Sequence, residues 1–163
     1  MGALQDTVFA LLANGKGLQK DLESNGALGL YAPLEGGSEG RYLRRLRAAG
    51  YTGLSLTARG LGDPASFLMG THGVRPPHLG KKDIRRYFVP PVIQTQLDTL
   101  PADSKGLVLW ILEGFILSRQ ELDYLVKLPE IEPRVKVVVE LGGDRAVRWK
   151  PLKEALAAAS ASA

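Results

Sequence analysis

The chain has 163 residues, of which 45% are hydrophobic and none is cysteine, and its net charge is +4. A chain of this size can bury one full hydrophobic core. The lack of cysteine excludes disulfides, thiolate zinc sites, cysteine-ligated iron–sulfur clusters and a thiol nucleophile. The longest apolar run, Leu107 to Leu112, is too short to span a membrane, and the N-terminus lacks the pattern of a signal or transit peptide. We therefore expect a soluble, unprocessed chain.

The first half of the chain predicts alternating helices and strands. The expected elements are a helix over 18–23, a strand over 27–32, a helix over 38–49 and a strand over 52–57. Asn25-Gly26 is a typical helix end, and Tyr42, Leu43 and Leu46 form one apolar stripe along the second helix. A strand, a helix and a strand in this spacing predict a βαβ unit with parallel strands.

A long segment rich in glycine and proline follows, over residues 57–82. It contains both histidines of the chain, His72 and His78, and a short helix is expected over 65–69 behind Asp63-Pro64. A loop of this length is usually functional or disordered.

The second half predicts more strands and two helices. Strands are expected over 85–89, 106–112, 135–140 and 145–149, the last two joined as a hairpin by Gly142-Gly143. Ser118 and Glu121 form a capping box for a helix that Pro129 and Pro133 should end, and Pro151 should begin a final helix. The chain is thus expected to be one α/β domain over 1–163, with a mostly parallel sheet, flanking helices and a C-terminal antiparallel hairpin. Residues 1–9 and 157–163 are expected to be poorly ordered tails.

Positive charge is concentrated in one part of the chain. Residues 33–86 contain ten basic and four acidic residues, a net charge of +6, which leaves −2 for the rest. Such a region suits an acidic protein, a nucleic acid or an anionic surface, and it could equally be a solvated basic face. Nucleic-acid binding by the helix over 38–49 stays open as an alternative, although only Tyr42, Tyr51, Tyr87 and Phe88 could stack on bases.

Three short patterns resemble catalytic or binding motifs. Gly36 to Gly40 fits G-x-S-x-G around Ser38, but a nucleophile elbow needs the strand to run directly into the serine, and a helix N-cap explains Ser38 more simply. Gly60 to Ala65 fits the dinucleotide fingerprint, which leaves a nucleotide-binding enzyme using the 57–65 loop as a further alternative, although the helix expected there is short. His72 and His78 could bind a metal, but no further ligands stand at suitable spacing.

Four stretches of the sequence resemble one protein family closely. They are YAPLEGGSEGRYLRRLRAAGY (31–51), LTARGLGDPASFLMGTHGVRPPHLGKK (56–82), KGLVLWILEG (105–114) and EPRVKVVVELGGDRAVRWKPLKE (132–154). They are similar to subunit N of the NAD(P)H–plastoquinone oxidoreductase (NDH) complex, the complex I relative of cyanobacteria and chloroplasts. The similarity extends from about residue 11 to about residue 156, and the lack of a transit peptide favours the cyanobacterial form.

The resemblance implies an accessory, non-catalytic subunit of the extrinsic arm, at the cytoplasmic side of the thylakoid membrane. The complex passes electrons from ferredoxin or NAD(P)H to plastoquinone and couples this transfer to proton translocation, in respiration and cyclic electron flow. Iron–sulfur clusters and plastoquinone would be bound by partner subunits, with no cofactor, metal or catalytic residue in this chain. The implied partners are other subunits of the extrinsic arm, with indirect contact to ferredoxin, no nucleic acid, and membrane association only through the complex.

The basic helix and the 57–82 segment together form the predicted partner interface, because they combine positive charge with a conformationally restricted glycine–proline loop. Its expected residues are Arg41, Arg44, Arg45, Arg59, Asp63, His72, Arg75, His78, Lys81 and Lys82.

Overall fold

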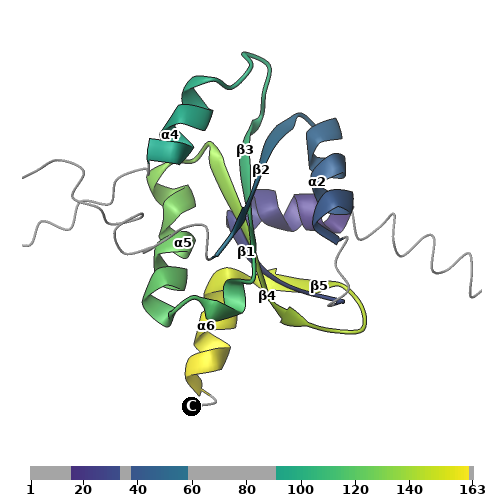
Figure 1. Ribbon diagram of the computed structural model, residues 1–163, viewed down its shortest axis with the longest axis vertical. Helices are drawn as coiled ribbons and strands as arrows, with labels where there is room; N and C mark the ends of the chain where they lie inside the picture. The colour runs from purple at the N-terminus through teal and green to yellow at the C-terminus, as the bar shows by residue number, and fades with distance from the viewer. Residues whose placement is uncertain (1–15, 34–37, 59–90, 162–163) are drawn as a thin grey trace, which may run out of the picture.

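The computed structural model describes residues 16–33, 38–58 and 91–161. At its centre is a five-stranded sheet with the order β2-β3-β4-β1-β5 (Figure 1). The strands are β1 (Ala27–Ala32), β2 (Tyr51–Thr57), β3 (Gly106–Leu112), β4 (Val135–Gly143) and β5 (Arg148–Pro151). The first four are parallel, and β5 runs antiparallel to β1. The predicted α/β class, with a mostly parallel sheet and flanking helices, is confirmed.

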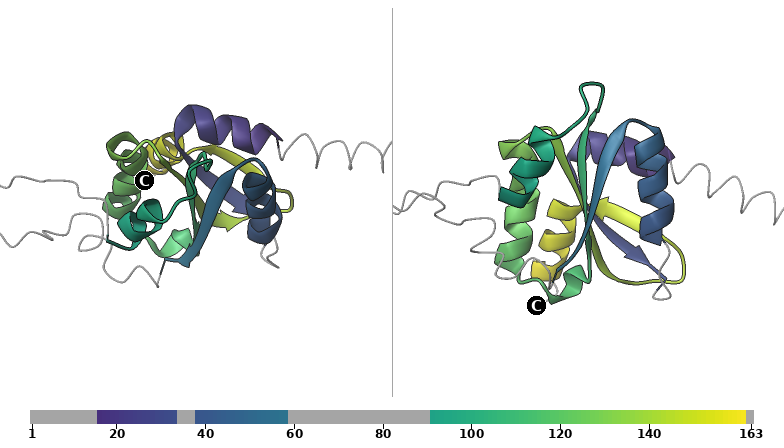
Figure 2. Two further views of the ribbon diagram at one scale, coloured as in Figure 1. Left: turned by 90° about the horizontal axis from the view of Figure 1, so that it is seen from above. Right: turned by 45° about the horizontal axis from the view of Figure 1, so that its top comes forward.

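Helices cover both faces of this sheet (Figure 2). One face carries α4 (Pro91–Asp98), α5 (Arg119–Ile131) and α6 (Leu152–Ala161), and the other carries a helix over residues 16–25 and α2 (Ser38–Ala48). A short 3₁₀ helix, η3 (Gly114–Ile116), follows β3 at the carboxyl end of the parallel strands, which is the lower end in Figure 1. The molecule therefore has three layers.

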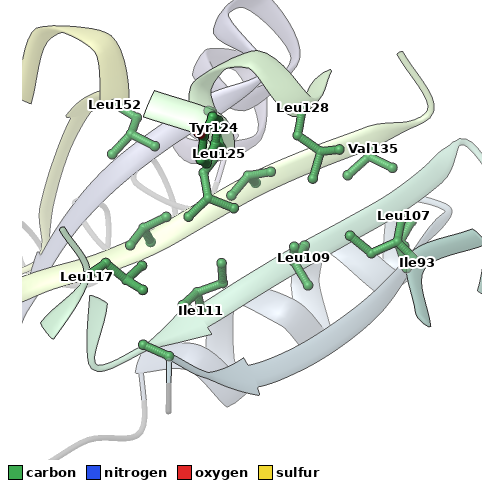
Figure 3. Packing of buried hydrophobic residues seen from close by; sticks show 14 of the residues in the cluster. Ile93, Leu107, Leu109, Ile111, Leu117, Tyr124, Leu125, Leu128, Val135 and Leu152 are labelled. Carbon is green, nitrogen blue, oxygen red and sulfur yellow. The ribbon is translucent and has the colours of Figure 1, made fainter. Parts of the chain in front are cut away.

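Strand β3 separates two hydrophobic cores, and its first six residues are buried. Leu107, Leu109 and Ile111 point toward α4 and α5, where they pack with buried side chains of those helices and of β4 (Figure 3). Val108 and Trp110 point to the opposite face and pack under α2 and the helix over 16–25. This arrangement confirms the expectation of a central strand buried on both faces.

The last strand pairs with a different neighbour from the one expected. Strand β5 is antiparallel, as predicted, but it lies beside β1, with Gly29 opposite Lys150. The hairpin partner was wrong because β3 and β1 occupy both edges of β4, so the returning chain must cross to the free edge of β1. Gly142 and Gly143 are correspondingly the end of β4, paired with Tyr31 and Ala32, and do not form a tight turn.

Strands β1 and β2 are parallel, but β3 and β4 lie between them, so α2 connects strands that are not neighbours. The parallel orientation predicted for the βαβ unit is confirmed, although its two strands are not neighbours in the sheet. Two strands inserted between the pair come from later in the chain, and nothing in residues 27–57 signals them.

Helix α5 continues through Pro129 to Ile131, so the prediction that Pro129 ends it was wrong. A proline removes one helical hydrogen bond, but Pro129 is buried, and the amide of Glu132 still donates to the Leu128 carbonyl at 2.9 Å. The N-cap half of the predicted capping box is confirmed, because the Ser118 hydroxyl accepts from the Glu121 amide at 3.1 Å.

Helix α4 was missed at the sequence level, although Pro91 stands at its first position, where proline is favoured. The expected strand over 85–89 and the expected helix over 65–69 lie outside the described residues. Helix α6 extends to Ala161, into the stretch over 157–163 that was predicted as a tail. The single domain over 1–163 and its poorly ordered tails stay predictions.

A buried tyrosine connects the helix over 16–25 to the sheet. The Tyr51 hydroxyl donates to the Glu23 carboxylate at 2.7 Å, and Tyr51 is 7% exposed. Burial, and then this hydrogen bond and the nearby negative charge, raise the pKa of Tyr51 well above its ordinary value. The protonated form is the stabilised one. The contribution of protonated Tyr51 to the free energy of unfolding is therefore fully present below the unfolded pKa near 10. It is lost as pH rises through the raised folded pKa.

Replacing Tyr51 with phenylalanine is expected to lower the free energy of unfolding by about 1 kcal/mol at neutral pH, because it removes one partly buried, charge-assisted hydrogen bond. The variant should also lose less stability than the parent above pH 10. Urea titrations at pH 7 and pH 10.5 measure both effects. Tyr31→Phe is the matched control and should change stability by less than about 0.5 kcal/mol. Equal losses in the two variants would contradict the assignment.

Candidate interaction surface

Helix α2 carries three of the predicted interface residues and is fixed by its apolar side. Tyr42, Leu43 and Leu46 are at most 3% exposed. The Tyr42 ring stacks on Trp110 with a centroid separation of 6.2 Å and an interplanar angle of 15°. Since this side is locked into the core, the opposite side of α2 must face solvent.

That solvent side is basic. Arg41, Arg44 and Arg47 are exposed and Arg45 is half-buried; we call these four residues the basic face of α2. Arg47 Nη2 donates to the Gly53 carbonyl at 3.4 Å, while Arg45 makes contacts of its own. Burial raises the pKa of Tyr42, and the positive charges of Arg41 and Arg45 oppose this rise. The structure thus brings the helical part of the predicted interface together as one charged surface.

The other predicted interface residues lie outside the described part of the chain. These are Arg59, Asp63, His72, Arg75, His78, Lys81 and Lys82. The point from which their segment departs is described: the Ala58 amide donates to the Leu112 carbonyl at 2.8 Å. The 57–82 segment therefore begins at the carboxyl end of β2, beside the end of β3.

A depression of about 280 Å³ lies at the same edge of the sheet. We call it the carboxyl-edge depression, and its lining residues come from the ends of β1, β3 and β4 and from η3. They are Ala32, Pro33, Leu112, Glu113, Phe115, Glu140 and Gly142. In α/β proteins, ligands bind outside the carboxyl ends of the parallel strands. This depression offers apolar surface with two carboxylates.

A second hollow, of about 600 Å³, runs between α5 and α6. Val126, Leu156 and Ala157 supply its apolar part, and its charged residues, Arg119, Asp123 and Lys153, are of both signs. Asp123 is already paired with Lys127 at 2.9 Å. The hollow therefore lacks the single-sign charge that would indicate one kind of ligand.

The described residues test one of the three motif hypotheses directly. The nucleophile elbow fails on geometry, because β1 ends at Ala32 and α2 begins only at Ser38, so the strand does not run into the serine. The G-x-G-x-x-A pattern over 60–65 and both histidines lie outside the described residues. Within residues 16–33, 38–58 and 91–161, no three acidic or histidine side chains group as metal ligands would.

Sequence reasoning missed the turn after β3, where Glu113, Gly114, Phe115 and Ile116 lie. A signal was present: two large apolar residues directly follow a glycine and the end of a buried strand. That pattern was passed over because it belongs to no helix or strand period.

The fold and surfaces define an α/β protein with one strongly basic helix face and an exposed apolar turn, features typical of proteins that bind other proteins. The sequence profile of the family described as NADH-quinone oxidoreductase cyanobacterial subunit N matches residues 9–154. The NAD(P)H-quinone oxidoreductase subunit N of Crocosphaera subtropica is 64% identical over 158 residues, covering 93% of this chain and 100% of that protein. The subunit N of Rippkaea orientalis is 64% identical over 155 residues, covering 91% and 98%, and that of Nostoc punctiforme is 60% identical over 157 residues, covering 92% and 99%.

The chain therefore belongs to the subunit N family of the cyanobacterial NAD(P)H-quinone oxidoreductase complex, and the resemblance drawn from the sequence is confirmed. None of the helices in the described residues has the length and apolar character needed to cross a bilayer.

Proposed function

We propose that this chain is an accessory, non-catalytic subunit of the extrinsic arm of the thylakoid NAD(P)H or ferredoxin–plastoquinone oxidoreductase, on the cytoplasmic side of the membrane. In this role it supports electron transfer to plastoquinone and the coupled translocation of protons. Partner subunits hold the iron–sulfur clusters and the quinone, and the chain reaches the membrane through them. Membership in the subunit N family over nearly the whole chain supports this proposal.

The basic face of α2 is the part of the structure that we assign to subunit contact, together with the 57–82 segment. The observation that carries this assignment is that Arg41, Arg44 and Arg47 are exposed on a helix whose other side is locked into the core. Arginine is enriched at protein interfaces because its planar guanidinium binds carboxylates in a bidentate manner. The expected partner surface is therefore acidic.

Reversing two of these charges, R41E with R44E, is expected to lower the retention of the chain in the complex about tenfold, because like charges would then face each other across the interface. The measurement uses the tagged full-length chain, expressed in a cyanobacterium that lacks its own subunit N. Quantitative mass spectrometry of the purified complex gives the amount of chain per complex. A second arm, R59E with R75E, tests the 57–82 segment in the same way.

The matched control is R119E with K153E, which reverses two exposed basic residues on the opposite helical layer. It should leave retention within about twofold of the parent, since isolated surface charges contribute little. Circular dichroism of each purified variant serves as the check that it is folded. Parent-like retention of R41E/R44E, or an equal loss in the control, would rule out α2 as the interface.

A further inference from the structure

The turn after β3 exposes two neighbouring apolar side chains. Phe115 is 64% exposed and Ile116 is 42% exposed. Among the described residues, the only other exposed large hydrophobic side chain is that of Ile131, which is 37% exposed and lies at the far end of α5. Single exposed apolar residues are common, but an adjacent pair at a sheet edge, beside a depression, indicates a binding surface.

The support under this pair is rigid. Gly114 is buried, and a Cβ added there would lie 2.2 Å from Val139 Cγ1, so η3 is pressed directly against β4. The Ile116 and Leu117 amides donate to the Glu113 and Gly114 carbonyls at 3.2 and 3.0 Å. Leu117 is buried in the core on the α5 side (Figure 3).

The backbone just before the pair is strained. Glu113 has a φ of 58° and a ψ of 34°, the left-handed region that non-glycine residues rarely adopt. Such conformations persist where the surrounding structure imposes them, and they concentrate at functional positions. A fixed apolar tip lowers the entropic cost of binding, because little has to be ordered on association.

The surroundings of the tip define the chemistry of its partner. Phe115 and Glu113 both line the carboxyl-edge depression, and the two charged residues of that lining, Glu113 and Glu140, are acidic. The charge around the tip is thus opposite in sign to that of the basic face of α2. A partner surface that complements the tip must combine an apolar pocket with basic side chains around it.

We propose that Phe115 and Ile116 form the anchor of a second docking surface, which inserts into an apolar pocket with a basic rim on another protein subunit. This surface goes beyond the contact assigned to α2, since it selects a partner region of opposite charge. Aromatic side chains that fill a pocket at the centre of an interface contribute most to binding, and the flanking carboxylates act on association rate and orientation.

The test replaces Phe115 with the photo-reactive amino acid p-benzoyl-phenylalanine in the full-length tagged chain, expressed in a cyanobacterium that lacks its own subunit N. Irradiation of the purified complex should crosslink position 115 to one other subunit, at apolar residues with lysine or arginine nearby. The same amino acid at position 131 is the control and should give at most a minor crosslink. Mass spectrometry identifies the crosslinked residues.

The F115A variant provides the energetic measure. It is expected to reduce retention in the complex about thirtyfold, which corresponds to the loss of a strong interface residue, whereas I131A should change it less than twofold. Circular dichroism should be unchanged in both, since both side chains are exposed. E113Q with E140Q should reduce retention about threefold, with the difference disappearing at high salt.

The proposal would be overturned if position 115 gave no crosslink and F115A were retained like the parent. It would also be overturned by a crosslink to a second copy of this chain, to lipid, or to residues 59–90 of the same chain. A crosslinked partner site that is acidic would overturn it as well. These outcomes at position 115 do not depend on whether the basic face of α2 binds a partner. Loss of retention in R41E/R44E with no effect of F115A would leave the proposed function standing and exclude this second surface.

Discussion

Replacing Gly114 with alanine is expected to lower the free energy of unfolding by about 3 kcal/mol, the upper end of the usual cost of overpacking a close contact. The added methyl would lie 2.2 Å from Val139 Cγ1 and 2.7 Å from the Glu140 carbonyl oxygen. Neither atom can yield easily, because Val139 is fully buried and Glu140 belongs to β4, which is paired on both sides. The turn must therefore shift away from the strand, and Phe115 shifts with it.

Equilibrium urea unfolding of the purified chain measures this loss, and crosslinking from position 115 in the G114A background reports the displacement of the tip. Gly40→Ala is the matched control, since a Cβ at Gly40 meets no other atom within 4 Å. Gly40 lies in α2, where alanine is the better helix former, so this control should raise stability by about 0.5–1 kcal/mol. A G114A variant that is as stable as the parent would show that η3 is not packed on β4 as described.

Local patterns in the sequence predicted the elements well and their neighbours poorly. The strand at Ala27–Ala32, the strand at Gly106–Leu112 and the helix that begins after Ser118 all follow from residues within the element or directly beside it. The pairing of β5 with β1 depends on the fact that both edges of β4 are already occupied. That fact is set by contacts between distant parts of the chain, such as Ala27 with Val137 and Leu107 with Val135, which no local period encodes.

Only part of the candidate surface was accessible to the same reasoning. The basic face of α2 could be predicted, because a helical period places Arg41, Arg44 and Arg45 outside the apolar stripe of one short helix. The tip at Phe115 could not, because its exposure results from the packing of Gly114 on a strand 25 residues further along the chain, as the contact with Val139 shows. Apolar composition alone would have placed Phe115 and Ile116 in the core.

The two surfaces lie on different elements and differ in chemistry. The basic face belongs to a helix on one side of the sheet, whereas η3 stands at the carboxyl edge of the strands. A subunit that contacts an acidic surface with one element and a basic, apolar surface with another can be oriented by charge alone, because the reversed placement would bring like charges together. The charge-reversal and F115A variants should therefore have additive effects on the binding free energy, so that their fold-losses of retention multiply in the combined variant.

Replacing Trp110 with alanine is expected to have the largest effect on stability, about 4 kcal/mol, as for other large aromatic residues in a core. Trp110 belongs to β3, its side chain is fully buried beneath α2, and its ring stacks on Tyr42. The basic face of α2 rests on this contact. Loss of the indole ring should therefore also weaken the packing of α2 on the sheet. Urea unfolding, followed by the fluorescence of the remaining Trp149, measures the change in stability.

Trp110→Phe separates packing from polarity at the same position. The indole Nε1 is buried, and no acceptor in the described part of the chain lies within hydrogen-bond distance of it. Leaving a buried donor unsatisfied costs about 1–3 kcal/mol, and phenylalanine removes that donor. Its smaller ring leaves a cavity of roughly 40 Å³, which costs about 1 kcal/mol. The two effects nearly cancel, so W110F should be within about 1 kcal/mol of the parent. A loss in W110F as large as that in W110A would show that the indole nitrogen has a partner and contributes to the stability of this core.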